Sequence, residues 1–353
     1  MIMADKTKEQ SVEELKTCYY DYELPPGFIA QEPLPERDKA RMMVVKRKTG
    51  DILHSTVKEL PSFLAPGDLL VLNDTRVLPA RLQGLKKNTG AKIEVFLLRP
   101  LSDDIWETLV RPGKKCPPGT TIFLKNNLQA EIIDRTESGG RIVKFVGNNI
   151  SREDLLSIGQ IPLPPYITKK LTDRERYQTI YAKHEGSVAA PTAGLHFTPA
   201  LFDSLKKAGV ITAFITLHIG LGTFRPVQTE NILEHKMHEE TYFVPQETAQ
   251  LIIEAKRRKS KVVAVGTTVC RTLESVANKL ENGQSGPFYG NTDLFIYPGF
   301  NFKIVEALLT NFHLPRSTLL MLVSAFSSRE LILKAYREAI SKRYRFYSFG
   351  DAM

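Results

Sequence analysis

The sequence predicts an α/β (α+β) protein, in which a larger mixed α/β domain is interrupted by an inserted small β-barrel domain. Short apolar runs separated by Pro-Gly and Gly-Gly turns occupy residues 66–154, and strand-like runs alternate with helix-like runs after them. Short strands at this spacing are typical of a small barrel or sandwich. Strands separated by helices indicate a parallel or mixed sheet. At 353 residues, the chain also exceeds the usual size of one compact domain.

Turn signals divide the inserted region into short strands. Pro112-Gly113 and Gly139-Gly140 are two of these breaks. The candidate strands are residues 69–72, 93–98, 105–110, 121–124, 130–133 and 141–146. We therefore assign residues 66–154 to the barrel, residues 19–65 and 155–353 to one discontinuous α/β domain, and residues 1–18 to an N-terminal extension.

Capping signals mark helix starts after the barrel region. Thr198 is a good N-cap and Pro199 suits the first helical position, so we expect a helix at 200–208. Ser327-Ser328-Arg329-Glu330 predicts a capping box at the start of the last helix. The other expected elements are helices at 247–258 and near Arg271, and strands at 211–218, 261–265, 293–297 and near 305–309.

Composition limits the functional classes. The net charge of +9 favours polyanionic partners, although surface lysines also serve simply to solubilise proteins. No apolar run is long enough to span a membrane, and the polar N-terminal residues do not resemble a secretory signal. The three cysteines form no CxxC pair and no disulfide framework, so we expect a cytoplasmic protein.

Two segments combine small residues with histidine. Residues 185–198 contain Gly194 and His196, and residues 218–225 begin with His218. Small residues let the backbone approach a ligand closely, and ligands of open α/β sheets bind where strands end. A tightly packed turn is the alternative interpretation of each segment. Gly220 and Gly222 are not followed by the third glycine of a dinucleotide-binding fingerprint, so residues 218–225 do not match that fingerprint.

Further polar segments are open to more than one interpretation. Residues 235–240 hold two histidines and two glutamates without the spacing of a zinc site, which leaves acid–base chemistry or a solvated loop. Residues 262–268 have the pattern of a strand, a turn and a helix start, which suits an anion or a ribose. Residues 73–76 and 310–315 are polar clusters beside apolar strands, and are also consistent with structural turns.

Long distinctive strings follow one another along nearly the whole chain, from YDYELP at 20–25 to YSFGDAM at 347–353. Between them stand LNDTRVLPARL (72–82), IPLPPYI (161–167), ERYQTIYA (175–182), APTAGLHFT (190–198), HIGLGTFRPV (218–227), VGTTVCRTLES (265–275) and TNFHLPRSTLLMLVSAF (310–326). In this order, the strings resemble those of the ribosyltransferase-isomerase family of queuosine biosynthesis.

The resemblance implies a reaction as well as the discontinuous fold. The ribosyl portion of S-adenosylmethionine is transferred and isomerised onto 7-aminomethyl-7-deazaguanine at the tRNA wobble position, which gives epoxyqueuosine-tRNA and releases adenine and methionine. S-adenosylmethionine is then a consumed substrate, no cofactor or metal is implied, and we expect a monomer. The alternatives are an S-adenosylmethionine-dependent RNA methyltransferase and a non-catalytic tRNA-binding protein.

The implied reaction needs a base for the proton beside the sulfonium and an acid for the departing adenine. The catalytic candidates are His196 and His218, with Glu185 and His238 as alternatives. The candidate substrate-binding residues are Thr192, Gly194, Gly220, Gly222, Thr223, Gly266, Thr267 and Thr268. The candidates for tRNA or ribose contact are Arg76, Arg111, Arg225, Asn311 and His313.

Overall fold

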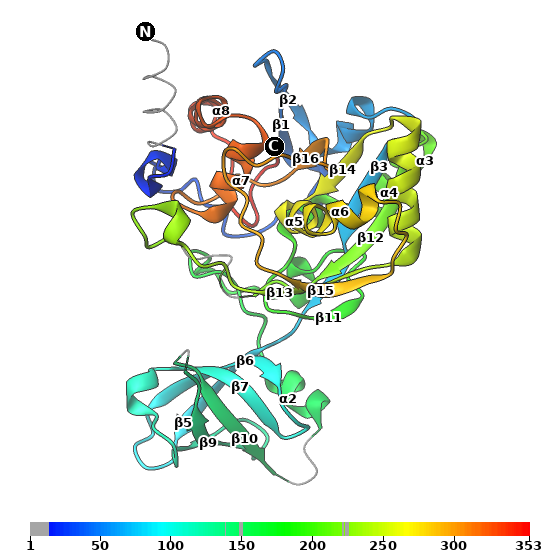
Figure 1. The fold of residues 1–353 in the computed structure, drawn as a ribbon. Helices are drawn as coiled ribbons and strands as arrows, with labels where there is room; N and C mark the ends of the chain where they lie inside the picture. The colour runs from blue at the N-terminus through cyan, green and yellow to red at the C-terminus, as the bar shows by residue number, and fades with distance from the viewer. Residues whose placement is uncertain (1–13, 138, 148–150, 221, 223–225) are drawn as a thin grey trace. The chain divides into compact units, whose positions relative to one another are not determined.

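The computed structural model describes residues 14–137, 139–147, 151–220, 222 and 226–353 (Figure 1). The chain forms two compact units. The larger unit runs to Arg76 and resumes with Pro164–Met353, and the smaller unit is Val77–Leu163. The predicted fold class, a mixed α/β domain with an inserted barrel, is confirmed.

A six-stranded sheet with the order β15-β13-β12-β3-β14-β16 forms the centre of the larger unit. Four neighbouring strands run parallel to one another. On one side of them, β13 pairs antiparallel with β12, and β15 pairs antiparallel with β13. The parallel strands are β12 (Ile211–Leu217), β3 (Leu69–Asn73), β14 (Val262–Val265) and β16 (Ala307–Leu309), and the antiparallel ones are β13 (Glu240–Val244) and β15 (Phe288–Thr292). The carboxyl ends of the four parallel strands therefore share one edge.

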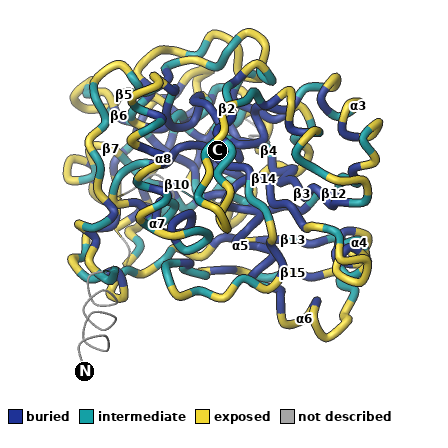
Figure 2. Tube along the Cα trace, turned by 90° about the horizontal axis from the view of Figure 1, so that it is seen from above, coloured by how far each residue is buried: buried dark blue, intermediate teal, exposed yellow. Residues whose placement is uncertain are grey.

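Both faces of the sheet are covered. Leu69 and Val71 of β3 belong to one hydrophobic core, and Leu70 and Leu72 belong to a second core on the opposite face. This explains why β3 is a continuous apolar run, as expected for a parallel strand buried on both sides. In Figure 2, β3 is dark blue, the colour of buried residues. Helices α4 (Gln246–Arg258), α5 (Thr267–Ser275), α7 (Thr318–Phe326) and α8 (Arg329–Ser341) contribute to the first core, and α3 (Pro199–Lys207) to the second.

Smaller elements complete the larger unit. Two separate strand pairs are β1 (Arg41–Val45) with β2 (Ile52–Thr56), and β4 (Thr75–Val77) with β11 (His184–Ser187). Near the end of the chain, Ala352 bridges to both Met42 and Asn311. The short helices are α6 (Ala277–Glu281) and the 3-10 turns Thr17–Tyr20, Arg37–Lys39, Val57–Phe63, Arg174–Tyr177, Thr192–His196 and Ile232–Glu234.

The smaller unit is a closed six-stranded barrel with the order β10-β7-β6-β5-β8-β9. Its strands are β5 (Arg81–Lys86), β6 (Lys92–Pro100), β7 (Ile105–Arg111), β8 (Thr121–Phe123), β9 (Gln129–Arg135) and β10 (Arg141–Val146), with a 3-10 turn at Gly113–Lys115. Alternate residues such as Leu82, Val95 and Trp106 are buried in its interior. Helix α2 (Arg152–Ile158) follows the barrel and starts with a capping box between Ser151 and Asp154.

Three expectations about the elements were wrong. Residues 69–72 form β3 of the larger sheet, because a fully apolar run suits a buried parallel strand, and the smaller unit therefore begins at Val77 and ends at Leu163. No strand forms at 293–297, since the hydrogen-bonded partner of β13 is the preceding segment, β15. Helix α8 is capped by Ser328, which accepts from the Leu331 N–H, so Glu330 cannot complete a capping box.

Candidate active site at the carboxyl edge of the sheet

Asn73 connects the ends of β3, β12 and the start of α5. Its amide Nδ2 donates to the Leu217 carbonyl (3.0 Å) and lies 3.3 Å from the Thr268 hydroxyl. Its Oδ1 accepts from the N–H groups of Leu217 (3.0 Å) and Thr75 (3.1 Å). Because Asn73 is fully buried and its amide is hydrogen-bonded at both ends, the residues that follow these strands are held in fixed positions.

Asp74 is a buried carboxylate at this edge. Thr216 donates to its Oδ1 over 2.6 Å, and His184 Nε2 lies 3.7 Å from its Oδ2. Burial raises the pKa of Asp74, although the Thr216 hydrogen bond and the neighbouring His184 oppose the shift. A carboxylate with a raised pKa is a better base near neutral pH than an ordinary aspartate.

His218 lies beside this carboxylate. Its Nδ1 is 2.9 Å from the Thr75 hydroxyl, and its ring packs against Gly186, where a Cβ would come within 2.7 Å of ring atoms. Burial and the nearby His184 lower the pKa of His218, while Asp74 acts in the opposite direction. The imidazole is therefore neutral at pH 7 and is fixed at one nitrogen.

His196 is the more deeply buried of the two favoured histidines. It closes the 3-10 turn Thr192–His196, and its Nε2 lies 3.5 Å from Asn311 Nδ2. Burial lowers the pKa of His196 to about 4. Only 5% of the residue is exposed. Its position favours a structural role, and it is a weaker proton carrier than His218.

A cavity of about 50 Å³ is lined by Thr268, which is hydrogen-bonded to Asn73, and by Ile219, which follows His218, but not by Asp74, His184 or His218 themselves. Several of the sequence-predicted residues line it, namely Thr192, Gly266, Thr267, Thr268, Asn311 and His313. Gly266 has a φ of +92°, which explains why glycine stands at the turn from β14 into α5. The cavity is therefore formed at the carboxyl ends of β14 and β16, where the sheet topology places ligands.

Asn311 and His313 belong to the interior of the larger unit. Thr192 donates to Asn311 Oδ1 over 3.0 Å, and His313 Nε2 lies 3.0 Å from the Thr310 hydroxyl. Burial lowers the pKa of His313 to about 3, so its ring is neutral. Both side chains are suited to a small ligand in the cavity, and neither offers a charge to the tRNA backbone.

Gly194 does not line the cavity. The space where a side chain would stand at Gly194 is filled by the Tyr181 hydroxyl and by Thr179 Cγ2. The glycine is therefore required by the packing of the protein against itself, which is the tight-turn interpretation of this segment.

A second polar group lies around Glu240. Its Oε1 accepts from the Gly220 N–H over 2.9 Å, and its Oε2 forms a buried ion pair with Arg271. Gly222 packs against the His238 ring, where a Cβ would clash. These contacts hold the start of the 218–225 segment against β13 and α5. Thr223 and Arg225 lie outside the described residues.

The remaining candidates lie away from this edge or on the surface. Glu185 is exposed on β11. Arg76 forms an ion pair with Glu175 at 2.5 Å. Arg111 is exposed on the barrel, where it faces Glu94 across the strand pair. Among the described residues, no group of three or more metal-ligating side chains comes together.

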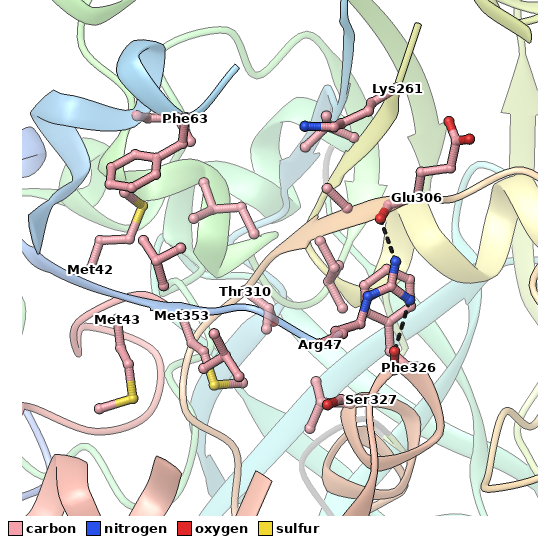
Figure 3. A pocket seen from close by; sticks show the side chains of 18 of the residues that line it. Met42, Met43, Arg47, Phe63, Lys261, Glu306, Thr310, Phe326, Ser327 and Met353 are labelled. Carbon is pink, nitrogen blue, oxygen red and sulfur yellow. Dashed lines mark hydrogen bonds between the residues drawn. The ribbon is translucent and has the colours of Figure 1, made fainter. Parts of the chain in front are cut away.

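A larger cavity of about 300 Å³ lies between β1 and β16 (Figure 3). Its lining is mainly apolar, with Met42, Phe63 and Met353 among the contributors. Arg47 closes one end: its guanidinium donates to the carbonyls of Glu306 (2.6 Å) and Phe326 (2.9 Å) and stacks on the Phe326 ring. Asp74, His184 and His218 line neither cavity, but the smaller one is lined by Thr268 and Ile219, which adjoin Asn73 and His218, so we place the chemistry at the carboxyl edge.

Five residues of the site, Asp74, Thr75, His184, Glu240 and Arg271, were not among the predicted site residues, although segments 73–76 and 235–240 were noted as polar. A usable signal was present for the first two, because polar residues directly follow the buried run 69–73 and strand ends are where such sheets bind ligands. No local signal pairs Glu240 with Arg271, which the sheet brings together from distant parts of the chain.

The fold and the site define a class: an α/β protein with an inserted barrel, whose ligand site carries an aspartate and histidines at the carboxyl ends of parallel strands. The chain belongs to the queuosine biosynthesis protein family, whose model matches residues 17–353. No helix among the described residues is long and apolar enough to cross a membrane.

Individual relatives agree with the family. The chain is 56% identical over 341 residues to the S-adenosylmethionine:tRNA ribosyltransferase-isomerase of Natranaerobius thermophilus, covering 96% of this chain and 99% of that protein. It is 57% identical over 340 residues to the protein of the same name from Carboxydothermus hydrogenoformans, with the same coverage. The crystal structure of S-adenosylmethionine tRNA ribosyltransferase from Thermotoga maritima matches at 43% identity with a TM-score of 0.54, over 95% of this chain and 99% of that one.

Proposed function

We propose that this protein transfers and isomerises the ribosyl moiety of S-adenosylmethionine onto 7-aminomethyl-7-deazaguanine at the wobble position of tRNA. The products are epoxyqueuosine-tRNA, adenine and methionine, and S-adenosylmethionine is consumed. The observation that carries the proposal is the cluster of Asp74, His184 and His218 at the carboxyl edge of the sheet, the edge at which Gly266, Thr267 and Thr268 line a cavity. Relatives named for this activity, at more than half identity over nearly the full length, support it.

The cluster supplies the proton acceptors that the reaction requires. The positive sulfonium acidifies the adjacent 5′ carbon of the ribose, and a base must take that proton. Asp74 combines burial, a raised pKa and one oxygen held by Thr216. His218, fixed at Nδ1 by Thr75, keeps Nε2 for a second proton transfer. We therefore assign the proton transfers to these two side chains, with His184 as the partner of Asp74.

The residues that line the cavity are suited to binding the substrate. Thr267 and Thr268 at the start of α5 offer hydroxyls and backbone N–H groups next to Gly266, an arrangement that suits ribose or carboxylate oxygens. Thr192 and Asn311, which are hydrogen-bonded to each other, form the opposite wall. We assign the nucleoside portion of S-adenosylmethionine to this wall.

The decisive experiment incubates the protein with S-adenosylmethionine and tRNA that carries the aminomethyl-deazaguanine. Equal amounts of adenine and methionine, dependent on the modified tRNA, are the expected result. Formation of S-adenosylhomocysteine instead would identify a methyltransferase. Binding of tRNA with S-adenosylmethionine left intact would identify a non-catalytic binding protein, and either result refutes the proposal.

A further inference from the structure

Two neighbouring apolar side chains lie on the outer surface of the barrel and do not belong to its buried interior. Leu85 on β5 and Phe123 on β8 are direct cross-strand partners, and they are 50% and 41% exposed. Lys92 on β6 lies opposite Leu85, and Gln129 on β9 lies opposite Phe123. An amide, an aromatic ring, an alkyl side chain and an ammonium group therefore follow one another across four neighbouring strands.

Lysines surround this pair. Residues 84–92 and 112–130 together contain six lysines and no acidic residue. Lys86 Nζ donates to the Lys115 carbonyl over 2.6 Å, and the Lys87 N–H donates to the Thr121 carbonyl over 3.0 Å, so the two segments lie side by side. Acidic side chains begin beyond these segments, at Glu94, which lies 3.4 Å from Arg81, and at Glu131.

We propose that this lysine-rimmed face, made of Leu85, Phe123, Lys87 and Lys92, docks a single-stranded stretch of the substrate RNA; the inference rests on the proposed function. An exposed aromatic ring on a strand gives an unpaired base a surface for stacking. Lysines around it neutralise the phosphates on either side of that base. Charge alone would suit any polyanion, and the ring at the centre of the charged rim favours unpaired RNA over an acidic protein or a duplex.

The first test compares RNA affinity between matched variants. Lys87→Glu with Lys92→Glu reverses two charges on the face, and Lys206→Glu with Lys207→Glu reverses two exposed lysines on α3 as the control. With unmodified anticodon stem–loop RNA as the probe, the first pair lowers affinity at least tenfold. It also reduces the log–log salt slope by about 0.7 for each phosphate of the single strand that the protein no longer neutralises. The control pair leaves both nearly unchanged. Equal effects of the two pairs would overturn the proposal, because they would indicate a non-specific charge effect.

The second test isolates the ring. Phe123→Ala lowers affinity for the loop about tenfold, the lower part of the range for one base–aromatic stack. Phe123→Trp retains it. Ile133→Ala, which truncates another exposed side chain of the barrel (42% exposed), is the matched control. RNA with 2-aminopurine in the loop shows fluorescence quenching on binding to wild type, and Phe123→Ala abolishes it.

Kinetics separate the two proposals. The variants on the face raise the KM for tRNA and leave the KM for S-adenosylmethionine and the kcat at saturating tRNA unchanged. If wild type binds RNA through this face but releases no adenine, the proposed function fails and the docking face stands. If the variants bind the loop as tightly as wild type while wild type turns over, the docking face is refuted. Equal loss of affinity for a blunt duplex and for the loop also refutes it.

Discussion

The ion pair of Glu240 with Arg271 allows a stability prediction with a worked magnitude. The side chains are 4% and 5% exposed, and Arg271 otherwise donates to the backbone carbonyls of Leu294 (2.9 Å) and Thr292 (3.4 Å). Glu240→Gln keeps the acceptor for the Gly220 N–H and removes only the charge. An uncompensated guanidinium then stays buried, which costs about 3–5 kcal/mol of the free energy of unfolding, with the lower end expected because two carbonyls remain.

The assay takes advantage of the single tryptophan. Trp106 lies inside the barrel, so its fluorescence reports the smaller unit, while far-UV circular dichroism also follows the larger one. At roughly 2–4 °C per kcal/mol, Glu240→Gln lowers the dichroism midpoint by about 10 °C.

Two controls identify the cause of this loss. Glu254→Gln breaks a pair that is about half exposed at 3.5 Å, and changes stability by about 0.5 kcal/mol or less. The double variant Glu240→Leu with Arg271→Met removes both charges and recovers most of the loss. A loss below about 1 kcal/mol for Glu240→Gln would refute the reasoning, since it would mean that water or another group compensates Arg271.

Three further predictions follow from the site. Asp74→Asn lowers kcat by roughly 10²–10⁴ and removes the acidic limb of the pH profile. Because burial raises the pKa of Asp74 in the folded state, ionisation of this carboxyl lowers the free energy of unfolding as pH rises through that pKa. Denaturant titration at pH 7 should therefore find Asp74→Asn more stable than wild type. A less stable Asp74→Asn variant would contradict the raised pKa. Gly194→Ala places a methyl group against the Tyr181 hydroxyl and lowers the free energy of unfolding by about 1–3 kcal/mol, measured by chemical denaturation. Adding Tyr181→Phe to the same chain restores part of the lost stability. Equal stability of the single and double variants would disprove the contact. Burial lowers the pKa of His196 to about 4 and that of His313 to about 3, so the unfolded chain binds protons first as pH falls below about 6.5. Stability should fall from about pH 6.5 down towards pH 4, more shallowly in His313→Gln, and identical slopes in both proteins would count against neutral burial of that ring.

Local patterns in the sequence were enough for part of the fold and little of the site. The N-cap at Thr198 and five of the six barrel strands depend on neighbouring residues, and they were predicted correctly; β5 was not expected. Strand β3 was placed in the wrong domain because an apolar run gives no indication of which distant strands will pair with it. At the site, His218 was found because it directly follows a strand. Its partners Thr75 and His184 come from a different strand pair, and only the folded sheet brings them together.

The pairing of β3 also has a consequence for synthesis of the protein. Leu69 pairs with Ile211 on one side and with Val262 on the other, so both neighbours of this strand leave the ribosome long after it. The barrel between them, Val77–Leu163, is one uninterrupted stretch whose strands pair within it. Domains generally fold as units in the order of synthesis. The barrel therefore forms first, while the apolar faces of β3 stay uncovered, and the carboxyl edge with Asp74 is completed only after β14 and β16 have been synthesised.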